Sequence, residues 1–283
     1  MLNASAARRE KLYESRTIVP RPFCKWAGGK RQLLAKLAPR VPERFGVYHE
    51  PFVGGGALFF AVQPAKSHLS DVNERLVRTY RGIQHDVEGV IRRLGEYPHQ
   101  RKFFEQMRER DVDANEQDAA VAAWLIYLNK TGYNGLYRVN SKNRFNVPFG
   151  DHKNPTICDE ENLRACSEAL TGAKVHCEDF AKVLDRAVSG DFVYFDPPYV
   201  PLSVTSYFTS YTSDGFDMDD QRRLRDVALA LKKKGVHVLL SNSSAPAVYE
   251  LYKTGFDIHT VEATRKVNCK ASGRGKITEL LIT

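Results

Sequence analysis

The four residues Asp196-Pro197-Pro198-Tyr199 are the part of this chain whose types and spacing best suit chemistry. They follow the wholly apolar run Phe192 to Phe195, which is typical of a buried strand. The two prolines fix φ and stiffen the turn. A fixed carboxylate and the Pro197 carbonyl could accept both N–H bonds of an exocyclic amine, while Tyr199 stacks on the base that carries it. The motif therefore indicates a site that makes the amino group of a planar base nucleophilic.

A glycine turn, Gly54 to Gly56, follows a short stretch of strand-like residues. In open α/β sheets, ligands bind at the carboxyl ends of strands, where glycines allow the backbone to approach closely. Asp71 ends the next predicted strand, where it could accept hydrogen bonds from a ribose. The dinucleotide fingerprint needs a third glycine where this chain has Phe59, so a dehydrogenase is disfavoured. The structural alternative is a tight turn with a helix-capping aspartate.

A second glycine pair, Gly28-Gly29, precedes Lys30 but does not form a phosphate loop. That loop needs glycine where this chain has Cys24, and Ser or Thr where it has Arg31, so an ATPase or GTPase is excluded. The cysteines form no C-x-x-C pair, and we expect neither a disulfide framework nor a metal site. They are Cys24, Cys158, Cys166, Cys177 and Cys269.

Positive charge is concentrated in three segments of the 283-residue chain. Its 42 Lys and Arg against 34 Asp and Glu give a net charge of +8. The segments Arg8 to Arg31, Thr131 to Lys153 and Thr264 to Lys276 carry +6, +3 and +5, so the remainder is acidic. Basic segments on an acidic body favour a polyanionic partner, nucleic acid first. Three solvated loops are the alternative that charge alone leaves open.

Predicted strands and helices alternate at both ends of the chain and are interrupted by a mostly helical insertion. This pattern predicts an α/β fold, an open sheet with an inserted domain. The expected strands are 47–50, 68–71, 175–177, 192–195, 236–240, 257–261 and 278–283. The expected helices are 33–39, 57–62, 73–94, 119–129, 159–169 and 220–234, and 131–150 is expected to form a loop or hairpin.

Three motifs in this order resemble the Dam-like, GATC-type DNA adenine N6-methyltransferases. They are Lys25-Trp26-Ala27-Gly28-Gly29-Lys30, Glu50-Pro51-Phe52-Val53-Gly54-Gly55-Gly56 and Asp196-Pro197-Pro198-Tyr199. The segments 134–140 and 145–150 of the insertion also resemble the family, and the likeness covers roughly residues 20 to 283. It implies a Rossmann-like methyltransferase sheet at 1–74 and 161–283, with a DNA-recognition domain carrying a hairpin at 75–160.

The resemblance implies S-adenosylmethionine as the cofactor. Trp26 and Lys30 would contact it from the N-terminal side, and Asp71 would hold its ribose. Asp196 would lie between cofactor and target base. The remaining implied cofactor contacts are Pro51, Phe52, Gly54 and Gly56 under the methionine part, and Asp179 and Phe180 beside the adenine ring.

The resemblance also implies how double-stranded DNA is read. Tyr133 would wedge into the base stack, Arg138 would read a guanine and Lys25 would reach the outer guanine. A guanidinium fork matches O6 and N7 of guanine, which gives the Arg138 assignment a physical basis. The other implied DNA contacts are Asn134, Leu136, Asn140 and Pro148.

The implied reaction is methylation at adenine N6 after base flipping, because the amine cannot react inside the duplex. The catalytic residues would be Asp196, Pro197, Pro198 and Tyr199, without a metal. The alternatives are an amino-methyltransferase for another DNA site, for cytosine N4, for RNA or for a glutamine amide, and a DNA-binding module without catalysis. The basic insertion argues against a protein substrate.

The protein is expected to be cytoplasmic and associated with the nucleoid. Its expected source is a bacterium, an archaeon or a phage. Its longest apolar run, Ala119 to Leu128, is shorter than the roughly 20 residues that cross a bilayer. The polar, basic N-terminal residues do not resemble a secretory signal. Beyond DNA, a cognate restriction endonuclease of the same restriction-modification system is a candidate partner, without a stable complex.

Overall fold

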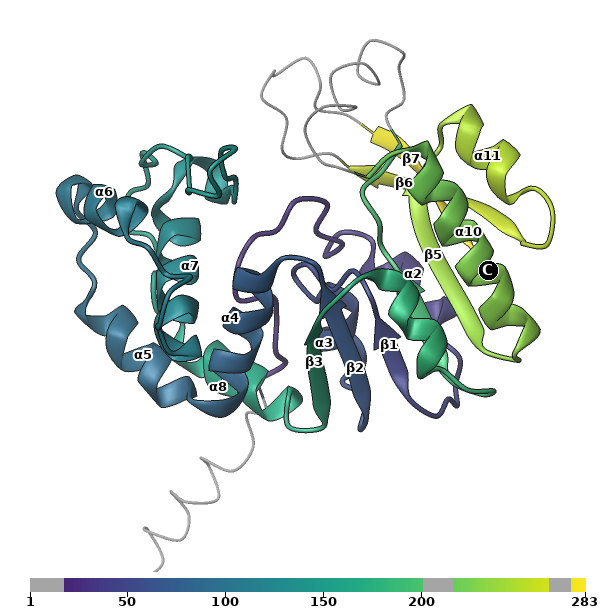
Figure 1. Ribbon diagram of the computed structural model, residues 1–283, viewed down its shortest axis with the longest axis horizontal. Coiled ribbons are helices and arrows are strands. Elements are labelled where there is room, and N and C mark those ends of the chain that lie inside the picture. The colour runs from purple at the N-terminus through teal and green to yellow at the C-terminus, as the bar shows by residue number, and fades with distance from the viewer. Residues whose placement is uncertain (1–17, 201–215, 265–275) are drawn as a thin grey trace, which may run out of the picture.

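A seven-stranded sheet forms the centre of the protein in the computed structural model, which describes residues 18–200, 216–264 and 276–283 (Figure 1). The strand order is β3-β2-β1-β4-β5-β7-β6. The first five strands run parallel, and β7 runs antiparallel to both of its neighbours. The bounds are β1 Tyr48–Glu50, β2 Ser67–Asp71, β3 Ala173–Cys177, β4 Phe192–Phe195, β5 His237–Ser243, β6 Ile258–Thr264 and β7 Lys276–Ile282.

The sheet reverses its direction of winding between β1 and β4. Strands β2 and β3 extend from one side of β1, and β4 and β5 extend from the other. Every residue of β4 is buried, as expected for a parallel strand covered on both faces. The carboxyl ends of β1 and β4 therefore form a topological switch point, where ligands bind in such sheets.

The helices are divided between the two ends of the sheet (Figure 1). Between β2 and β3 the chain forms α4 Glu74–His85, α5 Val87–Glu96, α6 Arg101–Glu109, α7 Asp118–Thr131 and α8 Glu160–Ala169. Helices α10 Met218–Lys233 and α11 Pro246–Tyr252 lie beside the other end of the sheet. The short helices α2 Leu34–Leu37 and α3 Ala57–Val62 precede β1 and β2.

Most of the predicted elements are present, and the α/β fold class is confirmed. The single helix predicted at 73–94 is wrong: it is two helices, because the Asp86 carboxylate accepts a bond from the Gly89 amide and begins α5 there. Helix α11 and the 3₁₀ helix Phe180–Asp185 were not predicted, since both are short. The segment 131–150 is a hairpin-like loop with bridges from Gly132 to Phe149 and from Val139 to Phe145.

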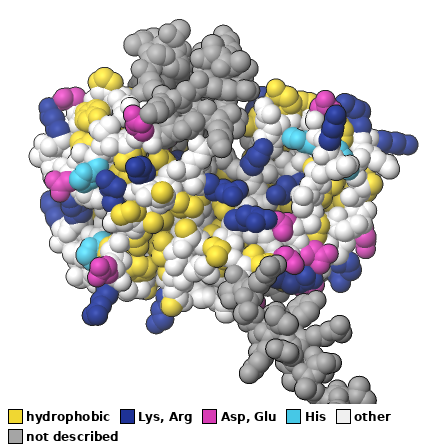
Figure 2. All heavy atoms as spheres, turned by 180° about the vertical axis from the view of Figure 1, so that it is seen from behind, with side chains coloured by type: hydrophobic (Ala, Val, Ile, Leu, Met, Phe, Trp, Pro, Cys, Tyr) yellow, Lys and Arg dark blue, Asp and Glu magenta, His cyan; other side chains and the backbone are white. Residues whose placement is uncertain are grey.

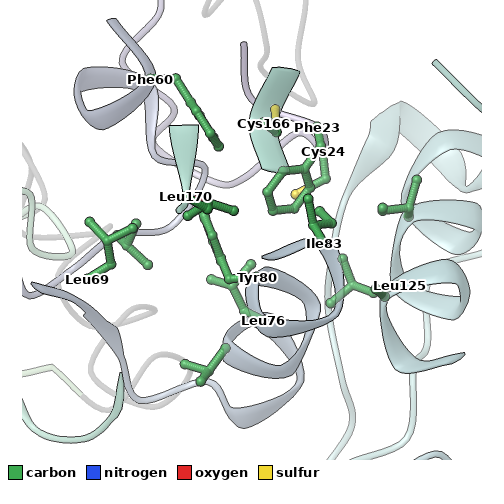
Figure 3. Close-up of a cluster of buried hydrophobic side chains, with 14 of the residues drawn as sticks. Phe23, Cys24, Phe60, Leu69, Leu76, Tyr80, Ile83, Leu125, Cys166 and Leu170 are labelled. Atoms are coloured by element: carbon green, nitrogen blue, oxygen red, sulfur yellow. The ribbon is translucent and has the colours of Figure 1, made fainter. Parts of the chain in front are cut away.

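The buried core continues from the sheet into the inserted helices. Figure 3 shows Leu69 of β2, Leu76 and Tyr80 of α4, and Leu125 of α7 in this cluster. Helix α7 is buried along nearly its whole length, because α4 and α5 pack against it. A shared core gives the insertion a fixed place relative to the sheet. The division into domains at 74/75 and 160/161 stays a prediction.

Among the described residues, no helix is long and apolar enough to cross a membrane. The four described cysteines are free thiols, and Cys269 lies outside the described residues. Cys24 and Cys166 belong to the buried core, and burial raises the pKa of each thiol to about 12. These two cysteines contribute as small apolar side chains.

Candidate active site and DNA-reading surface

Three carboxylates lie at the carboxyl edge of neighbouring strands. Glu50 ends β1, Asp71 ends β2 and Asp196 directly follows β4. The parallel register of β1 with β2 and β4 brings these strand ends to the same edge of the sheet. The parallel pairing of these strands therefore assembles the site at the switch point.

Asp196 is held by two donors on one of its oxygens. The Lys30 ammonium lies 2.7 Å from Asp196 Oδ1, and Ser241 Oγ donates to the same oxygen over 2.8 Å. The hydroxyls of Ser241 and Tyr194 are 3.0 Å apart. Burial raises the pKa of Asp196, and Lys30 and Ser241 oppose that rise. The second carboxylate oxygen, Oδ2, has no hydrogen-bond partner among the described residues.

The rest of the turn is fixed from elements that lie far away in the sequence. Tyr199 Oη donates to Glu279 of β7 over 2.7 Å. The Pro198 carbonyl accepts from Gln221 of α10 over 2.9 Å. No donor within the described part of the chain reaches the Pro197 carbonyl. An acceptor pair, Asp196 Oδ2 and the Pro197 carbonyl, is thus left for a ligand.

Lys30 is buried beside this turn, with 6% of its surface exposed. Its ammonium pairs with Asp196, donates to the Gly28 carbonyl and lies 4.4 Å from the centre of the Tyr199 ring. The sequence predicted Lys30 as a cofactor contact. The structure places it against two residues predicted to be catalytic.

Glu50 is a buried residue to which the sequence assigned no role. It is 2% exposed and accepts a hydrogen bond from Tyr48 Oη over 2.8 Å. Burial is the main cause that raises the pKa of Glu50 to about 8, and the charge of Asp196 adds to it. An acidic residue that ends a strand directly before Pro51 was the signal available in the sequence. Ser241, Gln221 and Glu279 were missed because only the folded sheet brings them to the turn.

The glycine turn lies between Trp26 and Asp71. The Gly54 amide donates to Asp71 Oδ2 over 3.2 Å, and Asp71 Oδ1 accepts from the Asn73 amide. A Cβ on Gly54 would lie 2.9 Å from Trp26 Cδ1, and φ there is +46°. Glycine at this position therefore allows the indole to pack on the turn. Burial raises the pKa of Asp71, and the backbone donors oppose that rise.

Phe52, which precedes the glycine turn in the chain, belongs to an aromatic wall. Phe52 stacks on Phe180 with ring centres 5.3 Å apart, and the Arg223 guanidinium lies 4.4 Å from the Phe180 ring centre. Asp179 accepts from the Ala181 amide and pairs with Arg223. Phe180 is 3% exposed, so it supports this wall from inside.

The predicted DNA-reading residues gather on the hairpin-like loop and beside it. Tyr133 is 50% exposed, and its amide donates to the Pro148 carbonyl. The exposed Arg138 donates from Nε to Asn146 Oδ1 over 2.7 Å. Lys25 reaches the loop from the N-terminal side, where its ammonium lies 3.3 Å from the Asn134 carbonyl oxygen.

The other three predicted DNA contacts differ in exposure. Pro148 and Asn140 are exposed, and Leu136 is half-buried against the core. Asn140 Oδ1 accepts from the amides of Lys142 and Arg144, so this oxygen shapes the turn. The side chain of Asn140 thus combines a structural role with an exposed amide group.

One aromatic stack joins the loop to the glycine turn. Tyr137 stacks on Trp26 with ring centres 5.0 Å apart and an angle of 23°. Burial raises the pKa of Tyr137, and Arg75 opposes that rise. Arg75 itself forms two hydrogen bonds with Asp113. The neighbours of Arg138 are therefore packed against the region predicted to bind cofactor.

Two of the basic segments lie partly or mostly outside the described residues. This applies to residues 8–17 and 265–275, whereas Thr131 to Lys153 is fully described. Figure 2 shows Lys and Arg side chains gathered near the middle of one face of the molecule. Within the described ranges, no group of His, Cys, Asp and Glu has the arrangement of a metal site.

The strand order is that of an open, Rossmann-like sheet, and the Asp-Pro-Pro-Tyr turn lies at its switch point. Residues 26–267 match the family described as D12 class N6 adenine-specific DNA methyltransferase. The chain belongs to this family and is an adenine-specific DNA methyltransferase. The predicted family and enzyme class are confirmed.

Named relatives span nearly the whole chain. A Type II methyltransferase, M1.LlaDCHI of Lactococcus lactis subsp. cremoris, is 47% identical over 96% of this chain and 98% of its own. The Type II methyltransferase M.MjaIII of Methanocaldococcus jannaschii is 42% identical over 93% and 98%. The DNA adenine methylase of Escherichia coli K12 is 33% identical over 92% and 94%.

Proposed function

We propose that this enzyme transfers a methyl group from S-adenosylmethionine to N6 of the adenine in GATC in double-stranded DNA. The observation that carries the proposal is a pair of acceptors to which no described residue donates, Asp196 Oδ2 and the Pro197 carbonyl, on a turn fixed at the switch point. Two acceptors match the two N–H bonds of an exocyclic amine. They would orient the amine with its lone pair directed away from them.

The residue types around the switch point fit the chemical groups of S-adenosylmethionine. Asp71 retains acceptor capacity for ribose hydroxyls, because a carboxylate has about four lone-pair sites and the backbone amides of its neighbours use only part of them. The Lys30 ammonium suits the cofactor's carboxylate, and the Trp26 indole supplies an aromatic surface. When bound, the cofactor would supply an electrophilic methyl group.

The other proposed cofactor contacts are Pro51, Phe52, Gly54 and Gly56 of the glycine turn, with Asp179 and Phe180. The turn would pass beneath the methionine part. Phe180, which is packed between Phe52 and Arg223, would border the adenine ring by its edge.

The catalytic residues would act by positioning the target base and its amino group. Asp196 and the Pro197 carbonyl would hold the target amine, and Tyr199 would stack on the base, which contributes about 1–3 kcal/mol. Ser241 and Tyr194 would keep Asp196 in position. Holding the two reactants in line supplies most of the rate, and the amine proton can leave after transfer.

The hairpin-like loop would select the site. Tyr133, half exposed beside Pro148, would enter the base stack and support flipping of the adenine, which costs a few kcal/mol. Arg138 would read a guanine through both of its terminal N–H groups. Lys25 would contact the outer guanine, and Asn134, Leu136, Asn140 and Pro148 would line the same surface.

We further infer that the chain has two domains with separate functions. Residues 75–160 would form the recognition domain, and 1–74 with 161–283 the catalytic domain. Because two relatives are named Type II methyltransferases, a cognate restriction endonuclease is the proposed functional partner, without a stable complex. The enzyme would act in the cytoplasm on the DNA of the nucleoid.

The test is methyl transfer from labelled S-adenosylmethionine to short duplexes that contain GATC or a single replacement at each of its four positions. We expect label at adenine N6 in GATC and a large loss for each replacement. Calorimetry measures binding of S-adenosylmethionine separately. Methylation of a different sequence would overturn only the proposed GATC specificity. Absence of cofactor binding would overturn S-adenosylmethionine as the proposed methyl donor.

A further inference from the structure

Two buried side-chain amides connect the peptide groups on either side of Tyr199. Gln221 of α10 donates from Nε2 to the Pro198 carbonyl over 2.9 Å, and its Oε1 accepts from Asn242 Nδ2 of β5 over 3.0 Å. Asn242 Oδ1 in turn accepts from the Val200 amide over 3.3 Å. Gln221 and Asn242 are 2% and 0% exposed. This Gln221–Asn242 bridge therefore links the carbonyl before Tyr199 to the amide after it.

The direction of the bridge is fixed by its two ends. The Pro198 carbonyl can only accept, so it requires the amino group of Gln221. The Val200 amide can only donate, so it requires the oxygen of Asn242. Turning either side-chain amide over would set donor against donor and acceptor against acceptor. Because a buried polar group without a partner is costly, the bridge favours a single arrangement.

The two linked peptide groups determine the backbone conformation at Tyr199. A residue has two soft dihedrals, and each relates its Cα to one of the flanking peptide planes. Holding both planes from the core thus fixes φ and ψ of Tyr199, and with them the direction of its Cα–Cβ bond. The Val200 carbonyl is held as well, because it accepts from Ser243 Oγ. Tyr199 itself is half-buried, so part of its side chain remains accessible.

We propose that Gln221 and Asn242 are positioning residues that hold the Tyr199 ring in the orientation required for stacking on the target base. This inference rests on the proposed function, in which Tyr199 stacks on the flipped adenine. Stacking depends on the relative orientation of the two rings, and a site loses efficiency when its supporting residues let a contact group shift. Both amides would act only through Tyr199, so they should affect the rate of methyl transfer and not the affinity for the cofactor.

The experiment measures single-turnover methyl transfer by the full-length enzyme at saturating DNA and labelled S-adenosylmethionine. The substrates are the GATC duplex and long unmethylated DNA that contains every four-base sequence, so variants can be compared whichever site is methylated. Gln221→Met keeps the length of the side chain and removes the amide. We expect it to slow methyl transfer about fivefold or more, the lower end of what loss of stacking on one base gives. Its affinity for S-adenosylmethionine, measured by calorimetry, should equal that of the wild type.

Gln84→Met is the matched control. Gln84 of α4 also donates from Nε2 to backbone carbonyls, those of Leu170 and Ala173. Ala173 begins β3, so these contacts lie at the opposite edge of the parallel strands from the turn. Gln84→Met should lower the urea midpoint of unfolding, as Gln221→Met does, and retain the wild-type rate. Asn242→Leu breaks the bridge at its other amide and serves if Gln221→Met does not fold.

A double variant with Tyr199→Leu determines whether the bridge acts through the ring. Effects of independent sites multiply in the rate. We expect Gln221→Met to slow the Tyr199→Leu enzyme by less than about twofold, because no ring remains to be positioned.

Multiplied losses in the double variant would overturn the proposal. So would a wild-type rate in folded Gln221→Met or Asn242→Leu, or an equal loss of rate in Gln84→Met. Failure of the proposed function is distinguishable, because the wild type itself would then place no label in the GATC duplex or bind no S-adenosylmethionine.

Discussion

The catalytic turn and the hairpin-like loop differ in what holds them. The turn at 196–199 is fixed by Lys30, Ser241, Gln221 and Glu279, which come from four other parts of the chain. The loop at 131–150 has hydrogen bonds across its own backbone and packs Phe145 and Val147 into the core, but its tip at 140–144 is exposed. A preorganised turn suits a reaction in which geometry determines the rate. An exposed loop suits contact with bases, where exchanging a few side chains changes the site that is read.

The largest effect is expected at the turn itself. Asp196→Ala should lower the single-turnover rate of methyl transfer by about 100-fold or more, because the amine loses its charged acceptor. DNA affinity, measured by fluorescence anisotropy, should change little. A variant that retains methyl transfer within about tenfold of the wild type would remove Asp196 from the proposed reaction.

Two substitutions of Tyr199 separate the contribution of its ring from that of its hydroxyl. Tyr199→Leu should slow methyl transfer by about tenfold or more, since the stacking surface is lost. Tyr199→Phe keeps the ring and loses only the bond to Glu279, so its rate should remain close to wild type. Single-turnover rates at saturating DNA provide the comparison. Equal losses in both variants would show that the hydroxyl, not the stacking face, is what matters.

Glu50 should make folding stability depend on pH. Its pKa is raised to about 8 in the folded state, so the folded protein binds a proton that the unfolded chain releases above about pH 4.5. The free energy of unfolding should therefore fall between pH 5 and 8, by about 1–3 kcal/mol. Glu50→Gln still accepts from Tyr48 and should flatten this decrease in urea titrations.

The exposed Glu43 provides the matched control for that measurement. Glu43→Gln should leave the wild-type pH dependence unchanged. If Glu50→Gln and wild type lose stability in parallel between pH 5 and 8, the buried carboxyl is not the source of the effect.

The smallest effect concerns phosphate contacts by the loop. DNA affinity should fall steeply with salt, with a slope of about −0.9 in the log–log plot for each phosphate neutralised. Lys142→Ala, at an exposed residue of the loop, should make the slope less steep by about one contact, whereas Asp196→Ala should leave it unchanged. Equal slopes for wild type and Lys142→Ala would show that Lys142 touches no phosphate.

The sequence predicted the parts of the molecule that depend on local patterns. The apolar run before Asp196 and the glycines before Ala57 specify a strand with its turn, and the structure has both. The sequence did not predict the Lys30–Asp196 pair, because 166 positions separate the two residues and only the sheet order brings them together. Tyr137 was likewise not predicted to stack on Trp26, since a ring in a polar loop gives no signal of its partner.

If the turn at 196–199 carries the reaction and the loop at 131–150 selects the sequence, substitution of Arg138 should change the choice of site without abolishing methyl transfer. Wild type and Arg138→Ala are compared on the GATC duplex and its single-base replacements by single-turnover methylation. We predict that Arg138→Ala accepts one guanine replacement that the wild type rejects, a change worth about 1–3 kcal/mol of discrimination, and still methylates GATC. A uniform loss on every duplex, with the wild-type ranking retained, would contradict the claim and leave Arg138 as a phosphate contact.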